Sequence, residues 1–121
     1  MKDYAVAQKL ESKREEMAHI ITDEVGKPIA FSRVEVDRCI ETIKLSANAM
    51  LHVNGETFDT SAMPSGKKSL AFYKREPVGV VLAITPFNFP LNLACHKLGP
   101  ALAAGNAVIY KPATATPLTA I

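Results

Sequence analysis

The segment from residue 84 to residue 91 has the densest group of side chains that could do chemistry. It reads Ile-Thr-Pro-Phe-Asn-Phe-Pro-Leu and directly follows an apolar run rich in β-branched residues. Asn88 therefore stands where a buried strand would end, and open α/β sheets bind ligands at that edge. The same asparagine could instead cap a helix whose first turn contains Pro90, and the pattern alone leaves both roles open.

Lys111 and the cysteines are the other candidates. Lys111 follows a second short apolar run, and it would lie at the same sheet edge if that run is a strand, although the pattern by itself favours a solvated loop lysine. Cys39 and Cys95 are the only cysteines, too few and too far apart for a disulfide framework or a zinc site. We therefore expect reduced, structural thiols and no metal site.

Two amphipathic helices are predicted ahead of the asparagine segment. The first runs from Asp3 to Val25, and Gly26-Lys27-Pro28 ends it because glycine accepts a left-handed cap and proline cannot continue a helix. The second runs from Ile29 to about Met50, with its charged residues, Glu35 among them, largely outside. The expected buried positions are Val6, Leu10, Met17, Ile21, Val25, Ile29, Val36, Ile40, Ile43, Ala47 and Met50.

The rest of the chain predicts a connector and then a strand–helix–strand unit. The predicted elements are an irregular connector over 56–66, a half-exposed edge strand over 70–73, a strand buried on both faces over 78–84, a helix over 91–104 bent at Gly99-Pro100, a strand over 107–110 and a helix start at Thr116-Pro117. This order is typical of the beginning of a doubly wound α/β fold. Two parallel strands leave raw sheet edges, so we expect further chain to cover them.

The segment from Glu76 to Ile121 resembles the start of the cofactor domain in the aldehyde dehydrogenase superfamily. There a strand leads into Pro-(Trp/Phe)-Asn-Phe-Pro, then Lys-x-x-Pro-Ala-Leu-Ala-x-Gly-Asn, then a strand ending in Lys-Pro, and all these motifs occur here in order. Weaker similarity extends upstream through residues 24–28 and 34–36. The resemblance implies a helical segment of that domain over 1–55, a connector and edge strand over 56–77, and the incomplete start of the Rossmann-like NAD(P)-binding unit over 78–121.

The resemblance also implies the reaction, the oxidation of an aldehyde to a carboxylic acid by hydride transfer to NAD or NADP. Family members attack with a cysteine thiolate and hydrolyse the thioester with a glutamate. Both residues would lie beyond Ile121, so we expect this chain alone to be an inactive fragment. Two alternatives remain: a non-catalytic remnant that serves as a folding or oligomerisation module, and a related acyl-CoA-forming or phosphorylated-substrate reductase.

Residue roles follow from the same resemblance. Asn88 matches the asparagine whose amide donates to the oxyanion, and Lys97 matches a lysine near the active site. The cofactor-binding positions are Ile84, Thr85, Pro86, Phe87, Lys111, Pro112, Ala113 and Thr114. NAD-preferring members often carry a glutamate where this chain has Thr114, so the choice between NAD and NADP stays open.

The implied substrate tunnel includes Asn92, Leu93 and His96. Unpaired polar groups in a narrow tunnel disfavour a hydrocarbon chain, so these residues predict a small polar aldehyde such as lactaldehyde, a semialdehyde or a phosphorylated aldehyde. The alternative for His96 is simple packing against the second helix.

Composition bounds the remaining functions. The formal net charge of +2 is spread along the chain, which argues against a nucleic-acid or anionic-membrane partner. No apolar run approaches the roughly 20 residues of a membrane span, and the N-terminus lacks the layout of a secretory signal. We expect a cytoplasmic protein that forms a homo-oligomer when intact.

Overall fold

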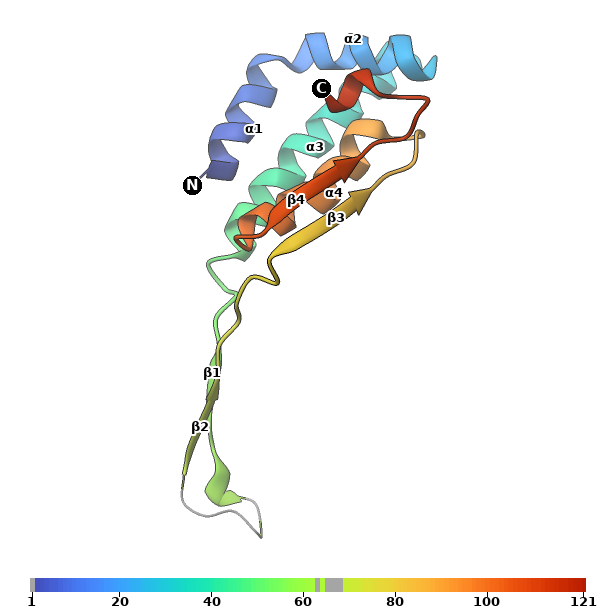
Figure 1. Ribbon diagram of the computed structural model, residues 1–121. Coiled ribbons are helices and arrows are strands. Elements are labelled where there is room, and N and C mark those ends of the chain that lie inside the picture. The colour runs from blue at the N-terminus through green and yellow to red at the C-terminus, as the bar shows by residue number, and fades with distance from the viewer. Residues whose placement is uncertain (1, 63, 65–68) are drawn as a thin grey trace.

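The computed structural model describes residues 2–62, 64 and 69–121 (Figure 1). Helices gather on one side of a small parallel sheet, and a β-hairpin extends away from them. The elements in chain order are α1 (Lys2–Ser12), α2 (Arg14–Val25), α3 (Ile29–Ala49), β1 (Glu56–Asp59), η1 (Thr60–Ala62), β2 (Leu70–Tyr73), β3 (Val80–Ile84), α4 (Pro90–Ala103), β4 (Ala107–Lys111) and η2 (Leu118–Ala120).

The first predicted helix is divided in two at Lys13. The break lets both halves contact α3, since the Lys44 ammonium pairs with Glu11 of α1 and the Arg14 guanidinium of α2 pairs with Asp37. The predicted end is confirmed: Gly26 has φ of +70° and its N–H donates to the Thr22 carbonyl at 2.9 Å.

Helix α3 is confirmed, and it packs along α4 at the centre of the core. A Cβ added at Gly99 of α4 would lie 2.8 Å from the Ser46 hydroxyl, so a residue without a side chain is what lets these helices approach. Glu35 was expected on the outside, and that prediction is wrong because its side chain lies in the α3–α4 contact. The buried core residues are Ala7, Ala18, Ile21, Val36, Cys39, Ile40, Ile43, Leu91 and Cys95.

The strand–helix–strand prediction is confirmed, because β3 pairs with β4 in parallel across α4, in register from Val80↔Ala107 to Ile84↔Lys111. Asn106 fastens the return of the chain, since its side-chain oxygen accepts from the Gly79 N–H and its amide donates to the Ala101 carbonyl. The expectation that β3 is buried on both faces is wrong. Its alternate residues Val80, Leu82 and Ile84 are exposed, because α4 covers only the other face.

The connector prediction over 56–66 is wrong at its start, where β1 pairs antiparallel with β2 in the hairpin. The short polar sequence Glu-Thr-Phe-Asp has little strand pattern of its own, and pairing with β2 supplies the hydrogen bonds. The strand predicted over 70–73 is confirmed, but it is more exposed than expected, because only Ala71 is half-buried. The helix start expected at Thr116-Pro117 gives a single 3₁₀ turn, whose Leu118 and Thr119 N–H groups donate to the Glu24 carboxylate.

Candidate active site

The carboxyl edge of the parallel pair brings together the two segments predicted to bind a cofactor. Ile84 and Lys111 are register partners at the last rung, and the Thr85 N–H donates to the Lys111 carbonyl at 3.4 Å. Ile84–Phe87 and Lys111–Thr114 therefore leave the sheet side by side. This is the edge at which open α/β sheets bind ligands.

The side chains at this edge divide into inward and outward groups. Thr85 is buried, and its hydroxyl lies 3.0 Å from the hydroxyl of the half-buried Tyr110. Tyr110 was not among the predicted site residues, although its alternation with Lys111 along the strand indicates the inward face. The residues left exposed for a ligand are Ile84, Pro86, Phe87, Lys111 and Thr114, with Pro112 and Ala113 half-buried.

Asn88 lies in the turn between β3 and α4, and its side chain is exposed. The cap position of α4 belongs to Phe89, which makes no side-chain cap bond, and Pro90 occupies the first turn as predicted. The alternative that Asn88 caps the helix is therefore wrong. Its amide is not used to begin α4, which leaves it available to a ligand at the strand edge.

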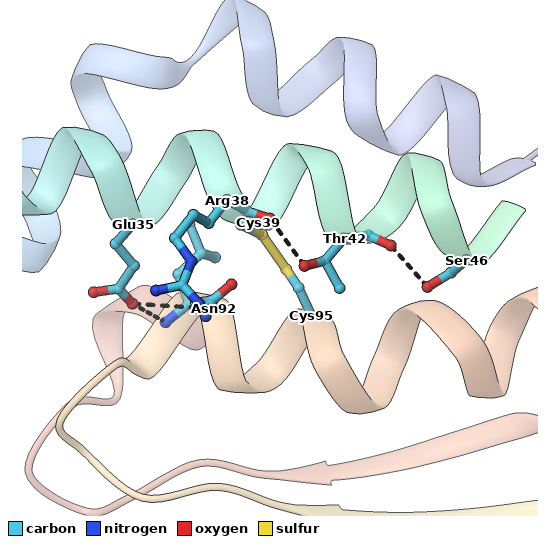
Figure 2. The surroundings of a disulfide bond; sticks show 8 residues. Glu35, Arg38, Cys39, Thr42, Ser46, Asn92 and Cys95 are labelled. Carbon is cyan, nitrogen blue, oxygen red and sulfur yellow. Dashed lines mark hydrogen bonds between the residues drawn. A yellow bond between two sulfur atoms is a disulfide. The ribbon is translucent and has the colours of Figure 1, made fainter. Parts of the chain in front are cut away.

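In place of a cap residue, the Glu35 carboxylate accepts hydrogen bonds from the N–H groups at the start of α4 (Figure 2). One of its carboxylate oxygens, Oε1, accepts the N–H of Leu91 at 3.0 Å and of Asn92 at 3.2 Å. Its other oxygen pairs with the Lys27 ammonium at 2.5 Å. Sequence reasoning missed this residue, although its position four residues before Cys39 places it on the same face of α3 as that cysteine.

The Glu35 carboxylate also excludes one mode of nucleotide binding. Helix N-termini bind phosphates through free N–H groups and the helix dipole. At α4 the protein's own carboxylate already accepts the N–H groups of Leu91 and Asn92, so they are not free for a phosphate. A nucleotide at this edge must therefore contact the strand ends and their loops, in agreement with the absence of a Gly-x-Gly-x-x-Gly sequence.

The predicted tunnel residues and Lys97 lie along α4. Asn92 is buried, and its Oδ1 has no hydrogen-bond partner among the residues that the structure describes. Leu93 is half-buried, while His96 and Lys97 are exposed. His96 borders an open groove of about 340 Å³ between α3 and α4, with Ser46, Met50 and Pro100 also in its wall.

The two cysteines are joined, so the prediction of reduced thiols is wrong in this structure (Figure 2). Cys39 of α3 and Cys95 of α4 are both buried, with their Cα atoms 5.7 Å apart. Their separation of 56 residues hid this proximity, because it follows from the packing of α3 on α4. Neither sulfur is free to act as a nucleophile.

Charged groups elsewhere form pairs on the helices. Arg14 donates to both oxygens of Asp37, at 2.6 and 2.7 Å, and this lowers the pKa of the Asp37 carboxyl.

In the described ranges 2–62, 64 and 69–121, no cluster of His, Cys, Asp or Glu could hold a metal ion. Nor does any helix described there combine the length and apolar content of a membrane span.

A protein family model and individual known proteins are similar to this chain. A family model described as "Aldehyde dehydrogenase family" matches residues 4–121. The chain is 50% identical over 115 residues to a 3-sulfolactaldehyde dehydrogenase of Priestia aryabhattai, covering 95% of the chain and 24% of that protein. It is 51% identical over 116 residues to a lactaldehyde dehydrogenase of Methanococcus vannielii, covering 96% and 24%.

Solved structures show the same arrangement of elements. An NADP-dependent glyceraldehyde-3-phosphate dehydrogenase of Bacillus halodurans, complexed with NADP, superposes with a TM-score of 0.94 at 43% identity. The match covers 98% of this chain and 25% of that one. The chain thus spans about a quarter of the length of the relatives and structures that it matches.

Proposed function

Because the chain belongs to the aldehyde dehydrogenase family, we propose that it works within a full-length enzyme that oxidises a small aldehyde to a carboxylic acid with NAD or NADP. The observation that carries the proposal is the shared edge of β3 and β4, where the Asn88 turn and Lys111 leave the sheet together. One segment offers an uncharged donor for the reacting oxygen, and the other offers a cation for a nucleotide.

Asn88 is proposed as the oxyanion donor. An amide donates a hydrogen bond without a charge that must be desolvated, and it stabilises negative charge that develops on the aldehyde oxygen after attack by a thiolate. The only cysteines of the chain are buried and bonded to each other. The proposed reaction therefore needs a cysteine outside residues 1–121, and it also uses a glutamate for thioester hydrolysis.

Lys111 and Thr114 are proposed to contact the adenosine ribose of the cofactor. When bound, NAD or NADP accepts the hydride from the substrate. Both side chains are exposed at the strand edge, so the donor set fits a ribose. A glutamate in place of Thr114 would repel a 2′-phosphate, whereas threonine and a nearby ammonium tolerate it. We therefore infer that NADP is accepted, and NADP-bound structural relatives support this.

The proposed substrate is a small polar aldehyde that Asn92 and His96 help to select. Relatives with about half of the residues identical are named for lactaldehyde and sulfolactaldehyde, which supports this class. Polar groups left unpaired by a hydrocarbon chain cost about 1–3 kcal/mol each. In the full-length enzyme, kcat/KM should therefore be higher for lactaldehyde or succinic semialdehyde than for hexanal. A clear preference for hexanal contradicts the substrate class, and a His96→Leu variant with unaltered discrimination removes His96 from it.

The test of the function is the rate of Asn88→Ala in the full-length enzyme. Loss of one oxyanion donor should lower kcat by about 10²–10³-fold, with a smaller effect on the KM for the cofactor. Asn54→Ala serves as the matched control, because Asn54 is an exposed asparagine in the loop after α3. An unchanged kcat, with chemistry shown to be rate-limiting, refutes the role of Asn88.

A further inference from the structure

Lys27 and Glu35 form a largely buried ion pair next to the Asn88 turn. The Lys27 side chain is 12% exposed and the Glu35 side chain is fully buried. Removing a carboxylate from water is costly unless its oxygens are satisfied. Here the two α4 N–H groups and the ammonium supply its partners, so the carboxylate is fixed in place.

Besides Glu35, the Lys27 ammonium contacts the turn that precedes α4. Its Nζ also donates to the Asn88 carbonyl at 3.1 Å, and it lies 4.0 Å from the centroid of the Phe89 ring. An ammonium over an aromatic face is attracted by the ring's negative charge density. The single cation therefore contacts two consecutive residues of the turn as well as Glu35.

Together these contacts leave the turn little freedom. Lys27 holds its last two residues before the helix, while Glu35 holds the first N–H groups of α4. The Asn88 carbonyl is thus held from the α2–α3 loop and the start of α4 is held from α3, while Asn88 itself is exposed. A hydrogen-bond donor whose backbone is fixed loses little freedom when it meets the oxyanion, and such preorganisation is what makes a donor effective.

We propose that Lys27 and Glu35 are positioning residues, which set the place of the Asn88 amide and so the rate of the reaction. This inference rests on the proposed function of Asn88 as oxyanion donor. In this proposal both residues act through the turn and the start of α4, which are the groups that they contact.

A double-mutant cycle in the full-length enzyme tests the coupling. Lys27→Met removes the donors but keeps the length of the side chain, and it should lower kcat by about tenfold or more, with a smaller change in the KM for the cofactor. In an Asn88→Ala background the same substitution should have little further effect, because its influence passes through the missing amide. Lys27→Arg, which keeps donors, should restore part of the rate.

The matched control is Lys44→Met, which removes an ammonium that pairs with Glu11 on the helix surface. It should leave kcat unchanged in both backgrounds. An equal fold-loss from Lys27→Met with and without the Asn88 amide would mean independent effects, and this overturns the positioning role. So would a fall in kcat of the same size in Lys44→Met.

Hydrogen exchange separates this inference from the proposed function. Lys27→Met and Glu35→Gln should speed the exchange of the Leu91 and Asn92 amides, while Lys44→Met should not. Unchanged exchange overturns the anchoring of the turn whatever the kinetics show. If Asn88→Ala itself leaves kcat unchanged, the proposed function fails and with it the role in rate, whereas faster exchange would still establish that the pair anchors the turn.

Discussion

Reduction of the Cys39–Cys95 disulfide should destabilise the chain strongly. The bond joins residues 56 apart, and it therefore closes a long loop in the unfolded chain. In the chain-entropy description a loop of this length stabilises the folded state by about 4 kcal/mol at 25 °C. Small domains have a total free energy of unfolding of about 5–15 kcal/mol, so the loss would remove a large part of it.

Urea unfolding followed by circular dichroism, with and without dithiothreitol, measures this contribution. The midpoint should fall on reduction, and the m-value should rise because the unfolded chain without the cross-link exposes more surface. A Cys39→Ala/Cys95→Ala variant is the control, since dithiothreitol should not alter its unfolding. Equal midpoints for the oxidised and reduced chains would refute the reasoning, because the closed loop would then contribute nothing.

Further predictions concern charge, cofactor choice and the chain by itself. Asp37→Asn should lower the free energy of unfolding by less than about 1 kcal/mol at pH 7, because the ion pair with Arg14 is half-exposed. That pair lowers the Asp37 pKa in the folded state, so the difference in the free energy of unfolding between wild type and Asp37→Asn should be full above about pH 4 and shrink as the pH falls further. Urea midpoints of the two proteins that differ equally at pH 7 and pH 2 would contradict this. Thr114→Glu in the full-length enzyme should raise the ratio of kcat/KM for NAD to that for NADP, and an unchanged ratio would remove residue 114 from the ribose site. The 121-residue chain alone should not reduce NAD(P) with an aldehyde, and aldehyde-dependent activity would contradict this. The unpaired edges of its two-stranded parallel sheet should make it self-associate or leave it only marginally stable; concentration-independent monomeric behaviour in sedimentation, together with a cooperative melt at high temperature, would contradict that expectation.

The sequence pattern of a single segment was sufficient to predict those helices, strands and caps whose structure depends mainly on that segment. The 3.6-residue spacing from Ile29 onward predicts α3, because its apolar stripe is the face that becomes buried. The β-branched run before Asn88 predicts the strand β3, but it does not predict that one face of the strand stays exposed. Gly26 likewise predicts its own left-handed cap. The carboxyl edge of β3 and β4 follows from the parallel order alone, so the sequence also predicted which segments meet there.

Features that depend on two distant elements were not predictable in this way. The spacing puts Glu35 on the same face of α3 as Cys39, but a charged residue on a helix is normally solvated. Its burial is explained only by the N–H groups of α4 that supply partners for its carboxylate. The disulfide depends on how closely α3 approaches α4, which Gly99 makes possible. Strand β1 forms through its pairing with β2, and the break at Lys13 through contacts of both halves with α3.

The hairpin of β1 and β2 lies wholly between the two bonded cysteines along the chain. Lys74 and Arg75 are exposed where the second strand ends, so a trypsin-like protease can reach the backbone there. A cut after either residue would divide the polypeptide but not the molecule, because the disulfide keeps the two pieces covalently joined across the core. The redox state of the two cysteines therefore decides what holds the cut chain together. With the disulfide intact the two pieces stay covalently linked, and with the cysteines reduced only the non-covalent packing of the helices links them.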